Sequence, residues 1–319
     1  MYLGYITDVK GLKVGHSQSQ EGITGCTVVL CTEGATGGVD VRGGAPGTRE
    51  TDLFKAENMI DKIHALVLAG GSAFGLDAAT GVMKYLEEQE VGFNVGVATV
   101  PIVASAVIFD LAIGNPKIRP DLEMGYRAAK DASITEKRQG NIGCGMGATV
   151  GKIMGPNNGM KSGIGSASIR FGDLVVSAIV SVNSFGDIYN HKTGEQIAGV
   201  YDYENKKLLN TIEIMTQNKV DLGFSIENTT IGIVGTNAIL TKAEANKVSQ
   251  MAHNGFARSI NPVHSMMDGD TIFTMATNTV KSDVNIVGTL AAEVMSRAIT
   301  NAILEAKSID GLYSYSDII

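Results

Sequence analysis

The chain changes character abruptly at Thr229. Residues 201–228 are polar and rich in Lys, Glu and Asn, whereas residues 229–240 are mostly apolar or β-branched. This switch predicts a solvated connector followed by a buried strand, a place where a cut would fix a new N-terminus in a core. Thr229 at such a terminus would carry a hydroxyl nucleophile and its own α-amine as base. The alternative is that Asn-Thr-Thr simply enters a strand, because Thr is a good strand residue.

The α-amine would be the less costly base at neutral pH. Its reference pKa is about 7.7–8, against about 10.4 for a lysine side chain. Freeing the amine at pH 7 therefore costs about 1 kcal/mol, whereas freeing an unperturbed lysine costs about 4–5 kcal/mol.

The chain is long enough to bury one large core or two smaller ones. Because it has no linker flexible enough to mark two domains, we expect a single domain over residues 1–319. The chain has 319 residues, of which 44% are hydrophobic, and its 39 glycines lie among apolar runs, which suggests tight turns and close packing rather than disorder. Its 26 Lys and Arg against 33 Asp and Glu give a net charge of −7 with no basic tract. We therefore expect neither nucleic acid nor an anionic membrane as a partner.

The cysteines and the N-terminus predict a cytoplasmic protein. Cys26, Cys31 and Cys144 are odd in number and lack CxxC spacing, so we expect free buried thiols in a reducing compartment. Residues 1–16 have no apolar core of the kind a signal peptide needs. The longest uncharged run, Val91 to Phe109, is interrupted by polar residues and is expected to be buried core rather than a membrane span.

Hydrophobic periodicity and turn residues predict an alternation of strands and helices. Strands are expected at Cys26–Thr32, His64–Ala69, Ser166–Phe171, Leu174–Val182 and Ile272–Ala276. Helices are expected at Leu76–Glu90, Leu122–Ala132, after the capping box Thr241–Glu244, and at Val284–Ala306. Glycine-dense loops are expected at Gly34–Thr48 and Gly140–Gly151.

The turn Gly70-Gly-Ser-Ala-Phe-Gly75 allows several interpretations. A glycine-rich turn between a strand and a helix can cradle a phosphate, but the spacing is neither GxGxxG nor GxxxxGK[ST]. A nucleophile elbow needs G-x-S-x-G, and Phe74 stands where its second glycine belongs. Tight packing is the favoured interpretation, and Ser72 is kept as a candidate substrate contact.

The remaining polar residues leave few chemistries open. The five histidines show no HxxxH spacing and Asp268-Gly-Asp270 does not fit an EF-hand, so we expect no metal and no cofactor. No serine is placed for a Ser-His-Asp hydrolase. Lys152 is unusual because it stands among small and apolar residues. The candidate catalytic set is Lys152, Asn183, Thr229, Asp268 and Asp270, although the two acids beside a glycine can equally form a turn.

Four motifs in order together resemble one family. They are Arg42-Gly-Gly-Ala-Pro-Gly-Thr-Arg-Glu-Thr-Asp52, Gly70-Gly-Ser-Ala-Phe-Gly-Leu-Asp-Ala-Ala79, Gly147-Ala-Thr-Val-Gly-Lys152 and Asn228-Thr229-Thr230. Along nearly its whole length the chain resembles the L-aminopeptidase/D-esterase family of self-processing Ntn-like hydrolases, which includes β-peptidyl aminopeptidases and nylon-oligomer hydrolases. The resemblance implies a four-layer αββα sandwich, one autoproteolytic cut and, usually, a homotetramer.

The resemblance also implies roles for individual residues. The cut falls between Asn228 and Thr229, giving fragments 1–228 and 229–319 with Thr229 as the nucleophile. Lys152 matches the lysine beside the nucleophile in the nylon-hydrolase branch, and Asn183 matches the oxyanion-stabilising amide.

The acidic pair and one aromatic residue depart from parts of the family. Asp268 and Asp270 match the nylon branch, whereas aminopeptidase members have Ser and an acid there, the acid holding the substrate ammonium. Phe109 stands where nylon hydrolases carry a Tyr, so this candidate substrate contact argues against synthetic oligomers as good substrates.

The expected function is therefore cleavage of small peptides or amino-acid amides through a Thr acyl-enzyme. In the precursor, Lys152 or a water would accept the first proton. In the mature enzyme Lys152, if buried, would serve better as a fixed charge that stabilises the alkoxide, balanced by an acid. Nylon-type oligoamide hydrolysis, glutamate N-acetyltransferase-like acyl transfer from acetyl-ornithine, an uncut binding protein and a nucleotide-binding module are the alternatives.

Overall fold

A computed structural model describes residues 1–217 and 228–319. Of the connector expected over residues 201–228, residues 218–227 lie outside the described residues. The part before them forms the small hairpin of β14 (Tyr201–Asp202) and β15 (Lys207–Leu208) and the short helix α3 (Thr211–Thr216).

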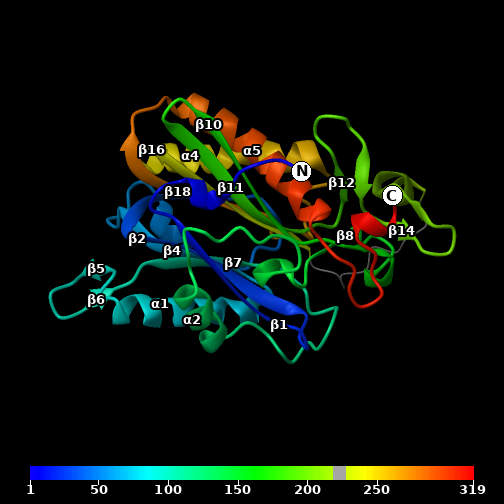
Figure 1. The fold of residues 1–319 in the computed structure, drawn as a ribbon, viewed down its shortest axis with the longest axis horizontal. Coiled ribbons are helices and arrows are strands. Elements are labelled where there is room, and N and C mark those ends of the chain that lie inside the picture. The colour runs from blue at the N-terminus through cyan, green and yellow to red at the C-terminus, as the bar shows by residue number, and fades with distance from the viewer. Residues whose placement is uncertain (218–227) are drawn as a thin grey trace.

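One large sheet organises the described residues (Figure 1). Its strands run in the order β10-β11-β16-β18-β2-β4-β7-β3, and β1 pairs with β2 off this path. The bounds are β1 Lys13–Ser19, β2 Thr24–Val41, β3 Thr48–Arg49, β4 Lys62–Ala69, β7 Val103–Val107, β10 Ile164–Phe171, β11 Leu174–Asn183, β16 Thr229–Ala238 and β18 Thr271–Val280. Neighbouring pairs are antiparallel except β16 with β18 and β4 with β7, which are parallel.

The long strand β2 folds this sheet into two layers. Its second part pairs with β18 and its first part pairs with β1 and β4, with a register shift between Leu30 and Ala35. Apolar side chains of β4 and β7 on one side and of β11, β16 and β18 on the other meet in one buried core, to which Leu66, Ile231 and Phe273 belong.

Helices cover both outer faces of these two β layers. α4 (Lys242–Ser259) and α5 (Val284–Leu304) pack on β10, β11, β16 and β18, and α1 (Ala78–Glu88) and α2 (Leu122–Lys130) pack on the other half (Figure 1). Alternate residues of β4 point to different cores: Leu66 points to the core between the layers and Val67 to the α1–α2 side. The predicted αββα architecture follows directly from this alternation.

Most predicted elements are confirmed, with small shifts at their ends. α4 begins with the predicted capping box, in which the Thr241 hydroxyl accepts the Glu244 N–H and the Glu244 carboxylate accepts the Thr241 N–H. The Gly70–Gly75 turn contains the start of a 3-10 helix, Ser72–Asp77, which precedes α1. The remaining strands are short: β5 Phe93–Asn94, β6 Thr99–Val100, β8 Thr149–Val150, β9 Met160–Lys161, β12 Asp187–Tyr189, β13 Gln196–Ala198 and β17 Ile260–Asn261.

Two predictions were wrong. The strand expected over Cys26–Thr32 continues to Val41, so half of the loop expected over Gly34–Thr48 is strand. The run Val91 to Phe109 is only partly core: β7 is buried, but residues 93–100 form a projecting hairpin on which Val97 is 96% exposed (Figure 1).

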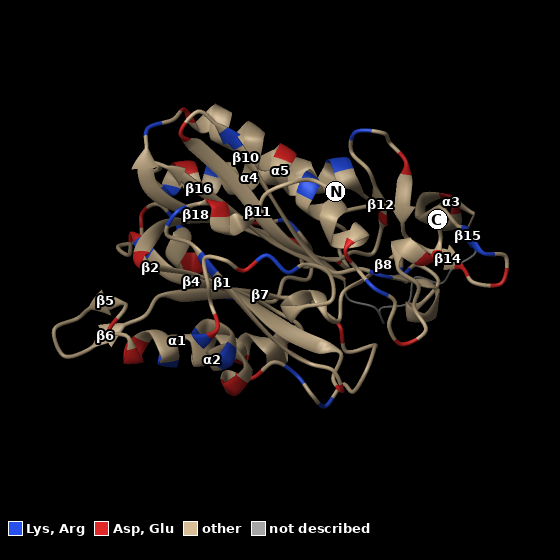
Figure 2. Cartoon of the chain, viewed as in Figure 1, with Lys and Arg blue, Asp and Glu red and all other residues tan. Residues whose placement is uncertain are grey.

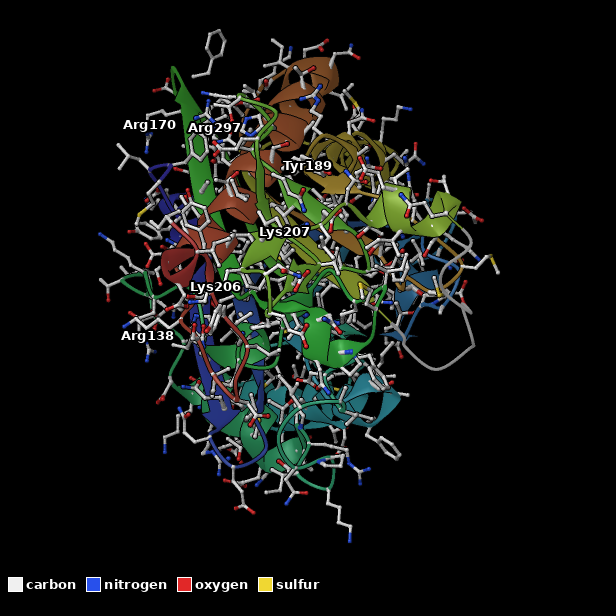
Figure 3. The ribbon with its side chains drawn as sticks, turned by 90° about the vertical axis from the view of Figure 1, so that its right-hand side faces the viewer. Arg138, Arg170, Tyr189, Lys206, Lys207 and Arg297 are labelled. Carbon is white, nitrogen blue, oxygen red and sulfur yellow. The ribbon has the colours of Figure 1, made fainter. Side chains whose placement is uncertain are left out.

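Charged residues lie mainly on the outer helices and loops of the cartoon (Figure 2). In the side view of Figure 3, Arg170 and Arg297 lie close to the same level near the top, with Lys207 and Arg138 below them. Arg138 and Arg297 have acidic partners, Glu136 and Glu293. No helix within the described part of the chain is both long and apolar enough to cross a membrane.

Candidate active site

Thr229 is held at the very start of a central strand. Asn183 at the end of β11 is its partner in the sheet register, and Asn228 forms a parallel bridge with Asp268. The Asn228 N–H also donates to the Met267 carbonyl at 2.8 Å. Thr229 is 4% exposed and Asn228 is fully buried. The peptide bond between Asn228 and Thr229 is thus fixed from both sides.

Within residues 1–217 and 228–319, two donors reach the carbonyl oxygen of Asn228. One is the Thr229 hydroxyl, in a short hydrogen bond, and the other is the Gly269 backbone N–H at 2.8 Å. A Cβ atom on Gly269 would lie 2.7 Å from Thr229 Oγ1, so only glycine allows this approach without a shift. An N–H at this distance is suited to stabilising negative charge on the oxygen. Sequence reasoning missed Gly269; its only sign was a glycine between two acids.

A cavity of about 280 Å³ opens beside Thr229. Its walls are residues 45–47, 72–73, 107–109 and Thr229 itself, so the two candidate substrate contacts, Ser72 and Phe109, both line it. Ser72 has a left-handed backbone with φ of 53°, and its N–H donates to the Ile108 carbonyl at 3.0 Å. Few non-glycine residues adopt this conformation, which here directs the Ser72 N–H to the cavity-lining residue Ile108.

Lys152 is buried, as its sequence context suggested, with an exposure of 3%. Its Nζ donates to the backbone oxygen of Asn183 at 3.2 Å and to the side-chain oxygen at 2.9 Å. Burial lowers the pKa of Lys152 to about 7, and the negative charges of Asp268 and Asp110 oppose this shift.

Asn183 links Lys152 to the cavity wall. Its Oδ1 also accepts the Thr149 N–H at 3.0 Å, and its Nδ2 donates to the Phe109 carbonyl at 2.9 Å. The backbone N–H that donates to the Asn228 carbonyl belongs to Gly269, and the oxyanion role of Asn183 stays a prediction.

The two acids have different partners. Asp268 Oδ2 accepts the Ser265 N–H at 2.9 Å and the Ser265 hydroxyl at 2.5 Å. Burial, followed by the charge of Asp270, raises the pKa of Asp268 to about 6. Asp270 binds the residue that directly follows Thr229: the Thr230 N–H donates to its Oδ1 at 2.7 Å.

The loop that contains the motif Arg42–Asp52 packs against the segment Asp268–Asp270. The N–H of Ala45 donates to the Asp268 carbonyl at 2.8 Å, and the N–H of Arg42 donates to the Asp270 carbonyl at 2.9 Å. The structure thus brings all five candidate catalytic residues around the Asn228–Thr229 bond. Across residues 1–217 and 228–319, no group of three or more His, Cys, Asp or Glu side chains is placed to hold a metal ion.

Known sequences and structures resemble this chain along nearly its whole length. An uncharacterized aminopeptidase of Mycobacterium leprae (strain TN) is 39% identical, over 97% of this chain and 92% of the relative. The 6-aminohexanoate-oligomer endohydrolase of Kocuria sp. (strain KY2) is 31% identical, over 94% of this chain and 84% of the relative.

Two solved structures share the fold. The L-aminopeptidase D-Ala-esterase/amidase of Ochrobactrum anthropi, described as a variant of the Ntn hydrolase fold, has a TM-score of 0.71 at 16% identity, covering 95% of this chain and 86% of that one. The β-aminopeptidase of Burkholderia sp. has a TM-score of 0.69 at 18% identity, covering 97% and 89%. The predicted Ntn-like fold is thereby confirmed.

The sequence profile of peptidase family S58 matches residues 4–315. The chain therefore belongs to peptidase family S58 and is a hydrolase of amide bonds.

Proposed function

We propose that the chain cuts itself between Asn228 and Thr229 and then uses Thr229 as the N-terminal nucleophile of an amide hydrolase. The observation that carries this proposal is the Asn228 carbonyl, which accepts both the Thr229 hydroxyl and the Gly269 N–H beside a cavity. A nucleophile and an oxyanion donor on one carbonyl are the two parts that acyl transfer requires.

The first step converts the peptide bond into an ester. Thr229 Oγ adds to the carbonyl carbon of Asn228 while its proton passes to Lys152 or a water, and Gly269 stabilises the resulting oxyanion. The carbon–nitrogen bond then breaks as the Thr229 nitrogen takes a proton. Water hydrolyses the ester, which leaves a carboxylate on Asn228 and a free α-amine on Thr229.

The mature enzyme repeats this chemistry on a substrate. The freed α-amine of Thr229 takes the hydroxyl proton, and the hydroxyl oxygen attacks the substrate carbonyl. The leaving amine departs from the tetrahedral intermediate, and water hydrolyses the acyl-enzyme. With a pKa near 7, Lys152 acts as a proton acceptor in the precursor and as a partial positive charge beside the nucleophile afterwards.

The substrates we infer are small peptides and amino-acid amides, which suit a cavity of about 280 Å³. Endohydrolysis of an oligoamide is the second candidate. It is favoured by the absence of an acidic side chain among the described residues that line the cavity. Asp268 and Asp270 are each no more than 2% exposed, so neither offers a carboxylate to a substrate ammonium in this state.

The test compares wild type with Thr229→Ala and Thr229→Ser in a denaturing-gel time course. Wild type should give fragments 1–228 and 229–319, and N-terminal sequencing of the smaller one should begin Thr-Thr-Ile-Gly. Thr229→Ala should stay intact and inactive because it has no hydroxyl. Thr229→Ser keeps the hydroxyl but loses the methyl that restrains χ1, so it should cut more slowly and retain some hydrolysis.

The same proteins are assayed with an aminoacyl p-nitroanilide, free and N-acetylated; preference for the acetylated form would favour the endohydrolase. Normal cutting or full activity of Thr229→Ala would place the nucleophile elsewhere, with Ser72 the next residue to test.

We also infer a cytoplasmic homo-oligomer, with a tetramer as the working model. The free, buried thiols of Cys26, Cys31 and Cys144 suit a reducing compartment. The projecting hairpin formed by residues 93–100 has no charged residue and exposes several apolar side chains, which suits burial against another copy.

A further inference from the structure

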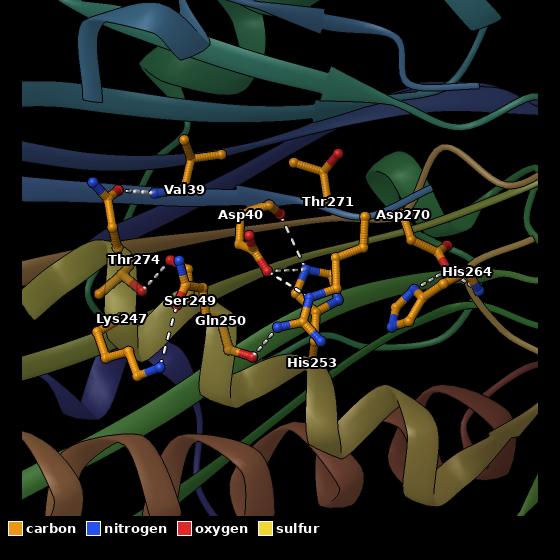
Figure 4. A network of polar contacts seen from close by, with 12 residues as sticks. Val39, Asp40, Lys247, Ser249, Gln250, His253, His264, Asp270, Thr271 and Thr274 are labelled. Carbon is orange, nitrogen blue, oxygen red and sulfur yellow. Dashed lines mark hydrogen bonds and ion pairs between the residues drawn. The ribbon is translucent and has the colours of Figure 1, made fainter. Parts of the chain in front are cut away.

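His264, which has no role in the mechanism above, hydrogen-bonds to the carboxylate of Asp270 (Figure 4). We propose that His264 is a positioning residue that orients Asp270 and, through it, the Thr229 nucleophile. This inference rests on the proposed function, because it assigns His264 to the same self-cutting and hydrolytic site.

Three N–H groups determine how the Asp270 carboxylate lies. Oδ2 accepts the backbone N–H of His264 at 3.1 Å and its ring Nδ1–H at 2.8 Å. Oδ1 accepts the Thr230 N–H at 2.7 Å. Asp270 is 1% exposed, so water does not replace these donors. His264 therefore holds one oxygen while the other restrains the residue that directly follows the nucleophile.

The backbone of His264 adopts a conformation that suits this double contact. Its φ is 59°, in the left-handed region that few non-glycine residues enter, although His, Asn and Asp do so more readily than others. The left-handed turn accompanies the approach of both its backbone N–H and its ring to the same oxygen.

Helix α4 supports the ring from behind. The rings of His264 and His253 meet edge-to-face with centroids 4.7 Å apart, and the fully buried His253 hydrogen-bonds through Nε2 to the Asp40 carbonyl at 3.0 Å (Figure 4). Arg42 Nε in turn binds the Asp40 carboxylate at 2.6 Å. The ring is therefore fixed by packing, while its hydrogen bond is made to the carboxylate.

The experiment compares two substitutions of the same shape, His264→Asn and His264→Asp. Asparagine and aspartate both tolerate the left-handed backbone at position 264. The asparagine amide can donate a hydrogen bond to Asp270 in place of the His264 Nδ1–H, whereas an aspartate carboxylate cannot donate and repels the Asp270 carboxylate. Readouts are the rate of cutting at Asn228–Thr229 and, on cut protein, kcat and KM for an aminoacyl p-nitroanilide. Lys206→Asn and Lys206→Asp, at an exposed left-handed position, are the matched control pair.

We expect His264→Asp to lower the cutting rate and kcat by about 10²-fold, the cost typical of a misplaced reacting group, with KM little changed. His264→Asn should recover most of both rates, and the Lys206 pair should behave as wild type. If His264→Asp does not fold, His264→Gly, which keeps the backbone and removes the ring donor, takes its place with the same expected loss.

Three outcomes would overturn the proposal. One is wild-type cutting and turnover in His264→Asp while Thr229→Ala stays uncut and inactive, which leaves the proposed function intact. Another is equal loss in the Asn and Asp variants in parallel with lower melting temperatures, which indicates a purely structural residue. The third is activity without any cut in wild type, which removes the proposed function and this inference together.

Discussion

Burial changes the acid–base chemistry of Lys152 strongly. A lysine at its reference pKa of about 10.4 is a costly base at pH 7, needing about 4–5 kcal/mol to lose its proton. With a pKa of about 7 in this site, roughly half of the Lys152 side chains are neutral at pH 7. The lowered pKa therefore makes Lys152 a less costly base for the first proton transfer in the precursor, while its protonated fraction supplies the positive charge expected beside Thr229 in the mature enzyme.

The rate of self-cutting should follow the titration of Lys152. Because only the neutral amine accepts a proton, the rate should rise with pH through about 7 and level off above it. Lys152→Met should cut about 10²–10⁴-fold more slowly and lose the rise near pH 7. Gel time courses between pH 5.5 and 9 measure both effects.

Asp268, whose pKa is raised to about 6, also titrates in this range, so the comparison with Lys152→Met is essential. An identical pH profile in that variant would assign the base to another group.

Two of the ordered motifs contain Lys152 and Thr229, and the family resemblance added Asn183, Asp268 and Asp270, but neither indicated Gly269 or His264. The contact of Gly269 is made by its backbone N–H, which every residue except proline has, so the sequence does not single it out. Only the 2.8 Å hydrogen bond to the Asn228 carbonyl in the structure identifies it. His264 is four residues before Asp268, and its contact with Asp270 depends on a left-handed φ that no local pattern specified.

At the scale of elements, glycines allow α1 and α2 to cross at very short distance. A Cβ on Gly81 would lie 1.8 Å from the Leu122 carbonyl oxygen, and one on Gly125 would lie 1.9 Å from the Ala78 carbonyl oxygen. Neither distance is physically possible, so any side chain here would push the two helices apart. Gly37 and Gly38 have a similar role in β2, beneath Phe54 and α4, which explains why glycine-dense sequence was mistaken for a loop.

Gly125→Ala should destabilise the fold by about 1–3 kcal/mol, the usual cost of overpacking, and lower the melting temperature. Because this crossing belongs to the outer α1–α2 layer, cutting at 25 °C should keep its wild-type rate. Thermal unfolding monitored by circular dichroism, beside the gel time course, checks both statements. Glu123→Ala, on the exposed side of α2, is the control and should change stability by less than about 0.5 kcal/mol. A Gly125→Ala protein as stable as wild type would contradict the close crossing.

At the scale of the whole molecule, several charged side chains are buried inside the fold. Lys152, Lys161, Asp110 and Asp268 are each 3% exposed or less. Lys161 donates to the carbonyls of Gly145 and Ala148 at 3.0 and 2.9 Å, and Asp110 accepts the Thr24 hydroxyl at 2.7 Å and the Gly71 N–H at 2.6 Å. Lys161 thus holds the glycine-rich loop at residues 140–151, and Asp110 holds the turn at residues 70–75. The sequence pattern shows only that these segments are rich in glycine.

Asp110 should make stability depend on pH in a defined window. Burial raises its pKa from 3.8 to about 6, so the folded state binds this proton more tightly than the unfolded state. The resulting stabilisation is complete below about pH 3.8 and is lost as the pH rises through about 6. A shift of this size corresponds to about 3 kcal/mol.

The stability of Asp110→Asn relative to its parent, both in the uncut Thr229→Ala background, should therefore increase by about 2 kcal/mol from pH 4 to pH 7, since at pH 4 the unfolded parent has already lost part of this proton. Urea unfolding of both proteins at the two pH values measures this gain, and a difference that does not vary with pH would rule out Asp110 as its source.

The strand order has a consequence for the two chains that the proposed cut would create. β16 and β18 of the smaller fragment lie between β11 and β2 of the larger one, so neither fragment has a complete sheet. The precursor folds as one molecule, in a reaction whose rate is independent of concentration. Once cut and unfolded, the same protein can return only by a bimolecular encounter of two incomplete halves. The mature enzyme would thus persist through slow unfolding rather than through ready refolding.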